Sequence, residues 1–223
     1  MSELPKRLLM MDVDSTLIQE EVIDLLATHA GVGEQVSAIT ESAMRGNLDF
    51  SDSLNERVAL LKGLPAEVLN EIRTDIHFSK GARTLVATLK AHGVKVGVVS
   101  GGFIEVVRGL AFELELDFSR ANSLEVVDGY LTGRTIGPII DRPAKAIALA
   151  EFAAEHSIPL AATVAAGDGA NDLGMLESAG LGIAFGAKPK VQELADIAIN
   201  SGQLDEILFH FGIPEAEWIR IHD

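Results

Sequence analysis

An apolar run that ends in two aspartates is the feature that most constrains what this chain can fold into. Residues 8–11 (Leu-Leu-Met-Met) are continuously apolar, and Asp12-Val13-Asp14-Ser15-Thr16 follows directly. Such a run is typical of a strand that is buried on both faces of a sheet. Aspartate is a poor strand former and Ser-Thr is typical of turns and caps, so we expect the strand to end at the two carboxylates. Taken alone, the pattern fits an Asp-rich turn that caps a helix equally well.

The composition narrows the class of protein. The chain has 223 residues, of which 48% are hydrophobic, so it suffices for one large domain or for one domain with an insert. No apolar stretch reaches the length of about 18 residues that a membrane span needs, and the N-terminus lacks the features of a signal peptide. The absence of cysteine excludes disulfides, thiolate metal sites and a cysteine nucleophile. We therefore expect a cytoplasmic protein without a membrane partner.

The charge argues against a nucleic-acid partner. The formal net charge is −15, and the 18 Lys and Arg residues form no basic cluster of the kind that a nucleic-acid surface requires. The same acidity repels phosphorylated small molecules at long range. If the protein binds one, local cations and backbone amides must hold it.

Helical periodicity dominates the segment after the aspartates. Four helices are predicted, over residues 19–30, 34–44, 50–61 and 65–74, and no strand is expected between residues 16 and 76. An insert of this length with its own helices is typical of a functional lid rather than of a loop. We therefore expect a catalytic core made of residues 1–15 and 77–223, and a helical cap made of residues 16–76.

Strands and helices alternate after residue 79. Strands are predicted over residues 94–99, 161–166, 181–184 and 197–199, with helices over 81–92, 103–112, 142–156, 173–179, 189–195 and 204–211. Residues 121–127 and 130–133 flank Asp128-Gly129, a pattern typical of a β-hairpin. The alternation predicts an α/β fold with a mostly parallel sheet, whose ligands bind beyond the carboxyl ends of the strands. No structure is predicted for the tail from Pro214 to Asp223.

Three of these strands end in polar or glycine-rich segments. They are followed by Asp12 and Asp14, by Ser100-Gly101-Gly102, and by Asp168 with Asn171 and Asp172 close behind. Carboxylates gathered at one sheet edge repel one another unless a cation is present, and oxygen ligands suit a hard ion such as Mg²⁺. Zinc is disfavoured because the chain has no cysteine and no paired histidine motif.

The same edge offers groups that can bind an anion. Ser100-Gly101-Gly102 lies between a predicted strand and a predicted helix, where backbone amides are available, and Lys145 lies near the start of another helix. The glycine pattern matches neither a dinucleotide-binding loop nor a nucleotide-triphosphate loop. These parts together predict phosphoryl transfer, in which Asp12 attacks phosphorus and Asp14 moves the protons.

Four segments of the chain resemble, in order, the four signatures of the haloacid dehalogenase superfamily of phosphatases. They are Asp12-Val13-Asp14-Ser15-Thr16, Ser100-Gly101-Gly102, Lys145, and Gly167-Asp168-Gly169-Ala170-Asn171-Asp172. Within the superfamily, residues 14–21 and 56–65 resemble the phosphoserine phosphatases. The resemblance implies a Rossmann-like core with an inserted four-helix cap. It also implies Mg²⁺-dependent hydrolysis of O-phosphoserine to serine and phosphate through an aspartyl-phosphate, the last step of serine biosynthesis.

The resemblance also implies roles for matching residues. Asp12 would be the nucleophile and Asp14 the acid/base, and Mg²⁺ would be held by Asp12, Asp168 and the backbone carbonyl of Asp14. Glu21 would bind the substrate ammonium and Arg57 its carboxylate, a group that suits bidentate recognition by Arg. The remaining expected residues are Ser100, Gly101, Lys145 and Asn171 around the phosphate, Met44 and Phe50 shielding the pocket, and Gly102 and Asp172 in supporting positions.

Two other functions are compatible with the sequence. A related enzyme with the same chemistry would act on another small phosphorylated amino acid, such as phosphohomoserine. A non-enzymatic phospho-aspartate switch would also combine an acidic Mg²⁺ site with a Ser and a Lys, but it needs neither a lid nor a second aspartate for proton transfer. The first strand begins near Arg7, so we expect the chain to lack the N-terminal regulatory domain found in many bacterial phosphoserine phosphatases. The sequence does not indicate an oligomeric state.

Overall fold

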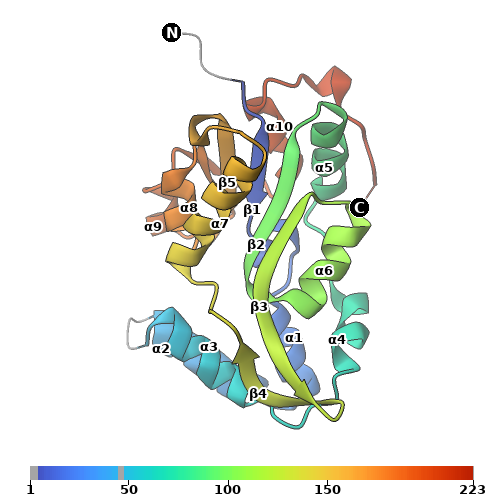
Figure 1. The fold of residues 1–223 in the computed structure, drawn as a ribbon, viewed down its shortest axis with the longest axis vertical. Coiled ribbons are helices and arrows are strands. Elements are labelled where there is room, and N and C mark those ends of the chain that lie inside the picture. The colour runs from blue at the N-terminus through green and yellow to red at the C-terminus, as the bar shows by residue number, and fades with distance from the viewer. Residues whose placement is uncertain (1–4, 45–47, 223) are drawn as a thin grey trace.

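The computed structural model describes residues 5–44 and 48–222, with Met44 described by its backbone alone. Its centre is a seven-stranded sheet of order β4-β3-β2-β1-β5-β6-β7, in which β4 alone runs antiparallel to its neighbour (Figure 1). The strands are β1 (Leu8–Met11), β2 (Lys95–Phe103), β3 (Phe118–Val127), β4 (Tyr130–Ile136), β5 (Thr163–Gly167), β6 (Gly182–Phe185) and β7 (Ile197–Ile199). The predicted α/β fold with a mostly parallel sheet is therefore confirmed.

Strand β1 lies at the middle of the sheet because it is apolar on both sides. It pairs in parallel with β2 and with β5, and all four of its residues are fully buried. Successive side chains of a strand point to opposite faces. Accordingly, Leu9 and Met11 belong to one hydrophobic cluster, and Leu8 and Met10 belong to a second. The strand predicted from the opening apolar run has the burial that its composition indicated.

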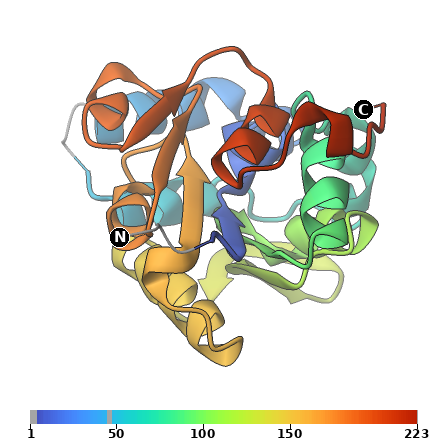
Figure 2. The ribbon, with the colours of Figure 1, turned by 90° about the horizontal axis from the view of Figure 1, so that it is seen from above.

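Helices cover both faces of the sheet (Figure 2). On the face of Leu9 lie α5 (Ala82–Ala91), α6 (Ile104–Glu113) and α10 (Ile207–His210). On the face of Leu8 lie α7 (Arg142–Glu155), α8 (Leu173–Ser178) and α9 (Pro189–Gln192). Because these helices cover the faces of the sheet, they do not cover the carboxyl ends of β1, β2 and β5.

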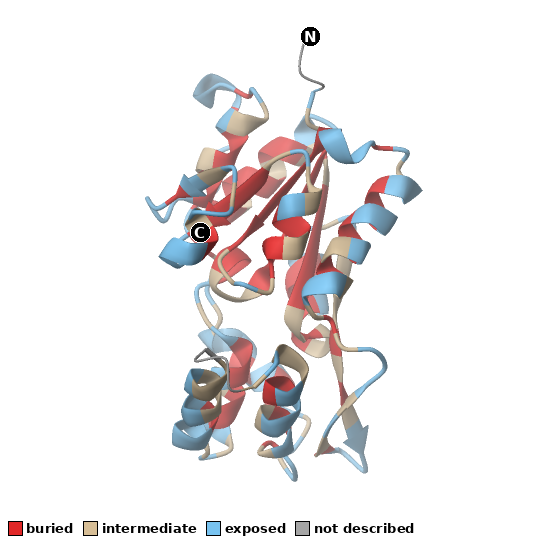
Figure 3. Ribbon diagram, turned by 90° about the vertical axis from the view of Figure 1, so that its left-hand side faces the viewer, coloured by how far each residue is buried: buried red, intermediate tan, exposed pale blue. Residues whose placement is uncertain are grey.

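A separate group of helices lies beyond those carboxyl ends (Figures 1 and 3). It consists of α1 (Val22–His29), α2 (Gly33–Met44), α3 (Phe50–Ala59) and α4 (Val68–Glu71), which continues as a 3-10 turn over Ile72–Asp75. α1, α3 and α4 each bury apolar side chains, α2 contributes the buried Val36, and the outward sides of these helices are exposed (Figure 3). We call this group the helical cap.

Two short linkers join the helical cap to the sheet. Ile18 forms a bridge with Phe78, and the amide of Gln19 donates to the carbonyl of His77 at 2.9 Å. The hydroxyl of Ser79 donates to the carbonyl of Thr16 at 2.6 Å. The outgoing and returning chains are therefore hydrogen-bonded to each other next to the aspartates.

Strand boundaries differ from the predictions where neighbouring strands determine them. β2 continues to Phe103, past the predicted end at residue 99, and β3 begins at Phe118 rather than at residue 121. The first part of β3 pairs in parallel with β2, whereas its second part forms the hairpin with β4. Local sequence patterns do not contain this pairing. The predicted Asp128-Gly129 turn is present, with φ values of 50° and 82° that are typical of a two-residue hairpin loop.

The C-terminal segment, for which no structure was predicted, lies across α5. The amide of Ile219 donates to Thr88 Oγ1 at 2.9 Å, and that of Ile221 donates to Thr84 Oγ1 at 3.0 Å. Trp218 is buried and its indole donates to the carbonyl of Ile213. Among the described residues, no helix has the length and apolar character that crossing a membrane requires.

Candidate active site

Asp12 stands where β1 ends. Its amide still donates to the carbonyl of Ala166 on β5, at 2.9 Å, so the backbone position is fixed by the sheet. Its Oδ1 accepts from the amide of Val13 at 2.7 Å and lies 2.8 Å from Lys145 Nζ. The residue is 5% exposed. A buried carboxylate paired with a cation is thereby held at the carboxyl end of the central strand.

Lys145 is fully buried in the first turn of α7. Asp141 caps this helix by accepting from the amide of Ala144, which fixes the turn that carries the lysine. Besides Asp12, the ammonium contacts Asp172 Oδ1 at 2.6 Å. Burial by itself lowers the pKa of Lys145, but the two carboxylates outweigh it and hold that pKa above its ordinary value. The lysine is therefore a permanent positive charge inside an acidic site.

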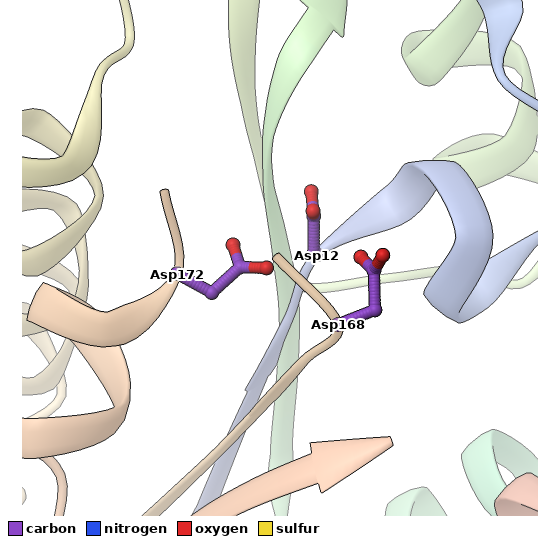
Figure 4. Close-up of side chains that lie close together, drawn as sticks. All are labelled: Asp12, Asp168 and Asp172. Carbon is purple, nitrogen blue, oxygen red and sulfur yellow. The ribbon is translucent and has the colours of Figure 1, made fainter. Parts of the chain in front are cut away.

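Three carboxylates converge at this point, from the end of β1 and from the loop after β5 (Figure 4). Ligand atoms of Asp12, Asp168 and Asp172 all lie within 4.8 Å of one another. Burial and the charge of Asp172 raise the pKa of Asp12, and they raise that of Asp168 to about 6. A cation placed among these groups would relieve both effects, so the site can bind a metal.

The chemistry of the donor set fits a hard divalent ion, because every ligand atom in the group is a carboxylate oxygen. Of the three carboxylates, Asp172 has the fewest oxygen atoms left to bind a metal. Its Oδ1 contacts Lys145, and its Oδ2 accepts from the amide of Gly169 at 2.9 Å. Asp172 therefore holds the lysine and the loop in place, and Asp12 and Asp168 are the groups with oxygens to offer.

Asp14 lies in different surroundings from Asp12, although only one residue separates them. Its Oδ1 accepts from the amide of Val22 at 2.8 Å, and its Oδ2 accepts from the hydroxyl of Ser100 at 3.0 Å. The backbone leaves helical geometry here, with ψ of 133° at Asp14 and φ of 56° at Ser15, and the two carboxylates accept hydrogen bonds from different partners. Burial raises the pKa of Asp14. A carboxyl group of this kind is suited to exchanging a proton.

The segment Ser100-Gly101-Gly102, at the end of β2, packs against Asp14 and against Phe50 of α3. Ser100 is fully buried and its hydroxyl accepts from the amide of Gly102 at 2.7 Å. A Cβ on Gly102 would lie 2.6 Å from Asp14 Oδ2, and one on Gly101 would lie 2.7 Å from Cζ of Phe50. A larger residue at either position would displace the Phe50 ring or the Asp14 carboxylate, because both side chains pack directly on the glycine backbone.

The two residues expected to recognise an amino acid lie on the helical cap and its linker. Glu21 accepts from the hydroxyl of Ser15 at 2.7 Å, and Arg57 Nε donates to the carbonyl of Ser53 at 3.1 Å. Glu21 is exposed as a residue, but burial of its carboxyl group and the charge of Asp14 raise its pKa to about 7. Burial lowers the pKa of Arg57, while the charges of Glu21 and Asp14 oppose that change. The two groups therefore share the electrostatic environment of Asp14.

The remaining predicted residues are placed less completely. Asn171 lies between Asp168 and Asp172, with its Oδ1 close to Gly169, where a Cβ would come within 2.2 Å. The side chain of Met44 lies outside the described residues. The roles assigned to all these site residues remain predictions.

Asn122 on β3 was not predicted and is part of the same structure. It is buried, its Nδ2 donates to the carbonyl of Gly101 at 2.7 Å, and its Oδ1 accepts from the amide of Ile140 at 2.8 Å. The available signal was an asparagine inside a predicted strand, where that residue is disfavoured. Asn122 therefore holds the backbone of the Ser100-Gly101-Gly102 segment in place from β3.

Known proteins resemble the chain over most of its length. The family model for haloacid dehalogenase-like hydrolases matches residues 9–177. The phosphoserine phosphatase of Streptococcus thermophilus is 54% identical over 208 residues, which are 93% of this chain and 96% of that protein. The phosphoserine phosphatase SerB2 of Mycobacterium tuberculosis is also 54% identical, over 95% of this chain and 52% of its own length. This chain thus spans about half the length of the mycobacterial relative.

A solved structure supports the same relationship. A structure of a phospho-aspartyl intermediate analogue of phosphoserine phosphatase superposes with a TM-score of 0.87 at 45% sequence identity, and it covers 93% of this chain and 99% of that one. The residues that the family model matches, 9–177, include the three clustered carboxylates, the Ser100-Gly101-Gly102 segment and the helical cap. The chain belongs to the haloacid dehalogenase-like hydrolase family.

Proposed function

We propose that the protein is a Mg²⁺-dependent phosphoserine phosphatase, which hydrolyses O-phosphoserine to serine and phosphate. The observation that carries the proposal is the different setting of two neighbouring aspartates. Asp12 lies against Lys145 inside the acidic cluster, and Asp14 lies against Ser100 and the amide of Val22. One carboxylate is placed to attack and the other to transfer a proton. The phosphoserine phosphatases named above, 54% identical to this chain, support the choice of substrate.

Asp12 attacks phosphorus in the first step. Its Oδ1 is engaged by Val13 and Lys145, and no hydrogen bond within the described part of the chain engages its Oδ2. We assign the attack to Oδ2, which forms the aspartyl-phosphate as the ester oxygen of serine leaves. Lys145 and the amides of the glycine segment stabilise the charge that gathers on the phosphoryl oxygens.

Asp14 supplies the proton that the leaving serine oxygen requires, and its raised pKa favours the protonated state from which that transfer starts. The resulting carboxylate then takes a proton from the water that attacks the aspartyl-phosphate. The hydroxyl of Ser100, which donates to Asp14 Oδ2, keeps the carboxyl group oriented in both steps. The acid cluster regains its starting state when phosphate leaves.

Mg²⁺ would be held by Asp12, Asp168 and the backbone carbonyl of Asp14, and when bound it would screen the repulsion between a carboxylate and a phosphate dianion. Asp172 would keep Lys145 and the Gly169 backbone in position from behind. Asn171 would orient the phosphate from the same loop.

Substrate choice is assigned to the helical cap, as a domain of residues 16–76 on a core of residues 1–15 and 77–223. Glu21 would bind the ammonium and Arg57 the carboxylate of phosphoserine, while Phe50 and Met44 would shield the pocket from water. Phe50 already contacts the backbone of Gly101, which supports a closed arrangement over the phosphate site. We further propose that the enzyme works in the cytoplasm.

The test is a phosphate-release assay on metal-stripped protein with Mg²⁺ added back, across phosphoserine, phosphothreonine, phosphohomoserine and a simple phosphate ester. We expect turnover that needs Mg²⁺ and prefers phosphoserine. A preference for phosphohomoserine would move the protein to the neighbouring substrate. Trapped aspartyl-phosphate without turnover of any ester would instead support the non-enzymatic switch, and activity in a chelator would contradict the metal site.

A further inference from the structure

Strands β3 and β4 form the edge of the sheet, but the residues around their hairpin turn are hydrogen-bonded to the helical cap. The amide of Gly63 donates to the carbonyl of Leu131 at 2.8 Å, and the amide of Leu131 donates to the carbonyl of Leu64 at 2.9 Å. The amide of Ala66 donates to the carbonyl of Gly129 at 2.8 Å. The cap is therefore attached to the sheet at a third place, distant in sequence from its two linkers.

The hairpin also packs against the end of α3. A Cβ on Gly133 would lie 3.0 Å from Lys62 Cβ and 3.1 Å from the carbonyl oxygen of Ala59. Leu124 and Leu131 are buried in the hydrophobic cluster that contains Leu61. Since α3 carries Phe50 and Arg57, the hairpin supports the helix that carries the proposed carboxylate ligand.

The inner end of the same hairpin holds the phosphate segment. Asn122 donates from Nδ2 to the carbonyl of Gly101 at 2.7 Å, and Phe103 is its Cα partner in the pairing of β2 with β3. One strand thus contacts Gly101 at its base, and the hairpin that it begins contacts α3 beyond it. Figure 1 shows this hairpin running alongside the cap from the edge of the sheet.

We propose that the β3–β4 hairpin is a specificity-determining element that sets the distance between the phosphate segment Ser100-Gly101-Gly102 and Arg57. This inference rests on the proposed function. A substrate whose phosphate and carboxylate match that distance engages both ends, and a longer or shorter one engages only the phosphate end. The hairpin positions these groups and takes no part in the chemistry.

Two glycine substitutions separate this role from a general effect on folding. Gly133→Ala introduces a Cβ against Lys62 and Ala59, at a φ of 82°. Gly137→Ala is the matched control, because its φ is 78° but no atom lies within 4 Å of the added Cβ. Both variants carry similar backbone strain, and only the first displaces the hairpin from α3.

The readout is kcat/KM for phosphoserine and for phosphoethanolamine, which keeps the ammonium and lacks the carboxylate. In Gly133→Ala, the added Cβ requires a shift of a few tenths of an ångström. A displacement of about 1 Å can cost ~100-fold, so we expect a smaller loss of roughly tenfold for phosphoserine, mainly in KM. Phosphoethanolamine should change less than about twofold, as should both esters in Gly137→Ala. The inference would be overturned if the ratio of kcat/KM for phosphoserine to that for phosphoethanolamine were unchanged in Gly133→Ala, whether both values fall equally or neither falls.

A wild-type protein that does not prefer phosphoserine over phosphoethanolamine would instead refute the proposed function, so the two failures are distinguishable. Amide hydrogen exchange on the wild-type protein provides a test that needs no variant. The amides of Leu131 and Gly63 should exchange as slowly as those of the central sheet. Exchange as fast as that of exposed turns would mean that the third attachment opens freely and cannot set a distance.

Discussion

Lys145 and Arg57 are both cations that border the site, and their surroundings differ. Lys145 is fully buried and contacts the carboxylates of Asp12 and Asp172 at 2.8 and 2.6 Å. Arg57 is half-buried, and its Nε donates to a backbone carbonyl of its own helix. The first cation is surrounded by permanent partners, whereas the second retains donors for a ligand.

This difference matches the roles that we propose for the two cations. A buried charge is tolerated only when it is paired and hydrogen-bonded, so Lys145 must have its carboxylate partners before any substrate binds. A group that selects among substrates needs hydrogen-bond donors that a ligand can satisfy, so the guanidinium of Arg57 must keep some of its donors for the substrate. In the proposed function, the groups that react with the phosphate lie at the sheet, and the groups that select the substrate lie on the helical cap.

The largest expected effect is that of Asp12→Asn. An amide is not a nucleophile, so kcat for phosphoserine should fall by about 10⁵-fold or more, as when other enzymes lose their nucleophile. The assay is phosphate release, with a thermal melt to show that the variant is folded. Turnover within tenfold of the wild type would mean that another group attacks phosphorus.

The second prediction concerns stability. Lys145→Met leaves two buried carboxylates without their cation, which should lower the free energy of unfolding by about 3–5 kcal/mol at pH 8. Arg57→Met should lower it by less than about 1 kcal/mol, because that side chain is half-buried. Urea unfolding of both metal-free variants measures the difference. Similar losses would show that the two cations are equally part of the folded structure.

The third prediction concerns recognition. Arg57→Ala removes charged hydrogen bonds worth about 1.5–3 kcal/mol each, so kcat/KM for phosphoserine should fall by roughly 10- to 100-fold. Phosphoethanolamine, which has no carboxylate, should be affected much less. The same loss on both esters would show that Arg57 supports the cap rather than the substrate.

The smallest effect is expected from pH. The pKa of Glu21 is raised to about 7, so its carboxylate becomes neutral as the pH falls through 7 and attraction for an ammonium is lost. The ratio of kcat/KM for phosphoserine to that for an ester without an ammonium should therefore fall between about pH 8 and pH 6. The ratio cancels titrations common to both esters. Glu21→Gln should remove this pH dependence, and a dependence that persists in that variant would assign it to another group.

Local sequence patterns predicted much of the fold. The continuous apolar run of β1, the Asp128-Gly129 turn and the start of α7 at Arg142 each depend on interactions within a few residues. For the same reason, the carboxyl ends of the strands could be identified as the place where Asp12, Ser100 and Asp168 would meet. The family resemblance, and not the residues alone, singled out Glu21 and Arg57.

Features that depend on distant segments could not be predicted from these patterns. The early start of β3 depends on pairing with β2, and the contact of Asn122 with Gly101 joins positions 21 residues apart. The raised pKa of Glu21 depends on burial and on the charge of Asp14.

For the opening motif, the sequence by itself determined that a buried strand ends in two carboxylates, because apolar periodicity and turn preference are local properties. Only the tertiary structure decided that Asp12 pairs with Lys145 while Asp14 pairs with Ser100. The partners come from α7 and β2, and the energy of a charge depends on the groups that surround it in space.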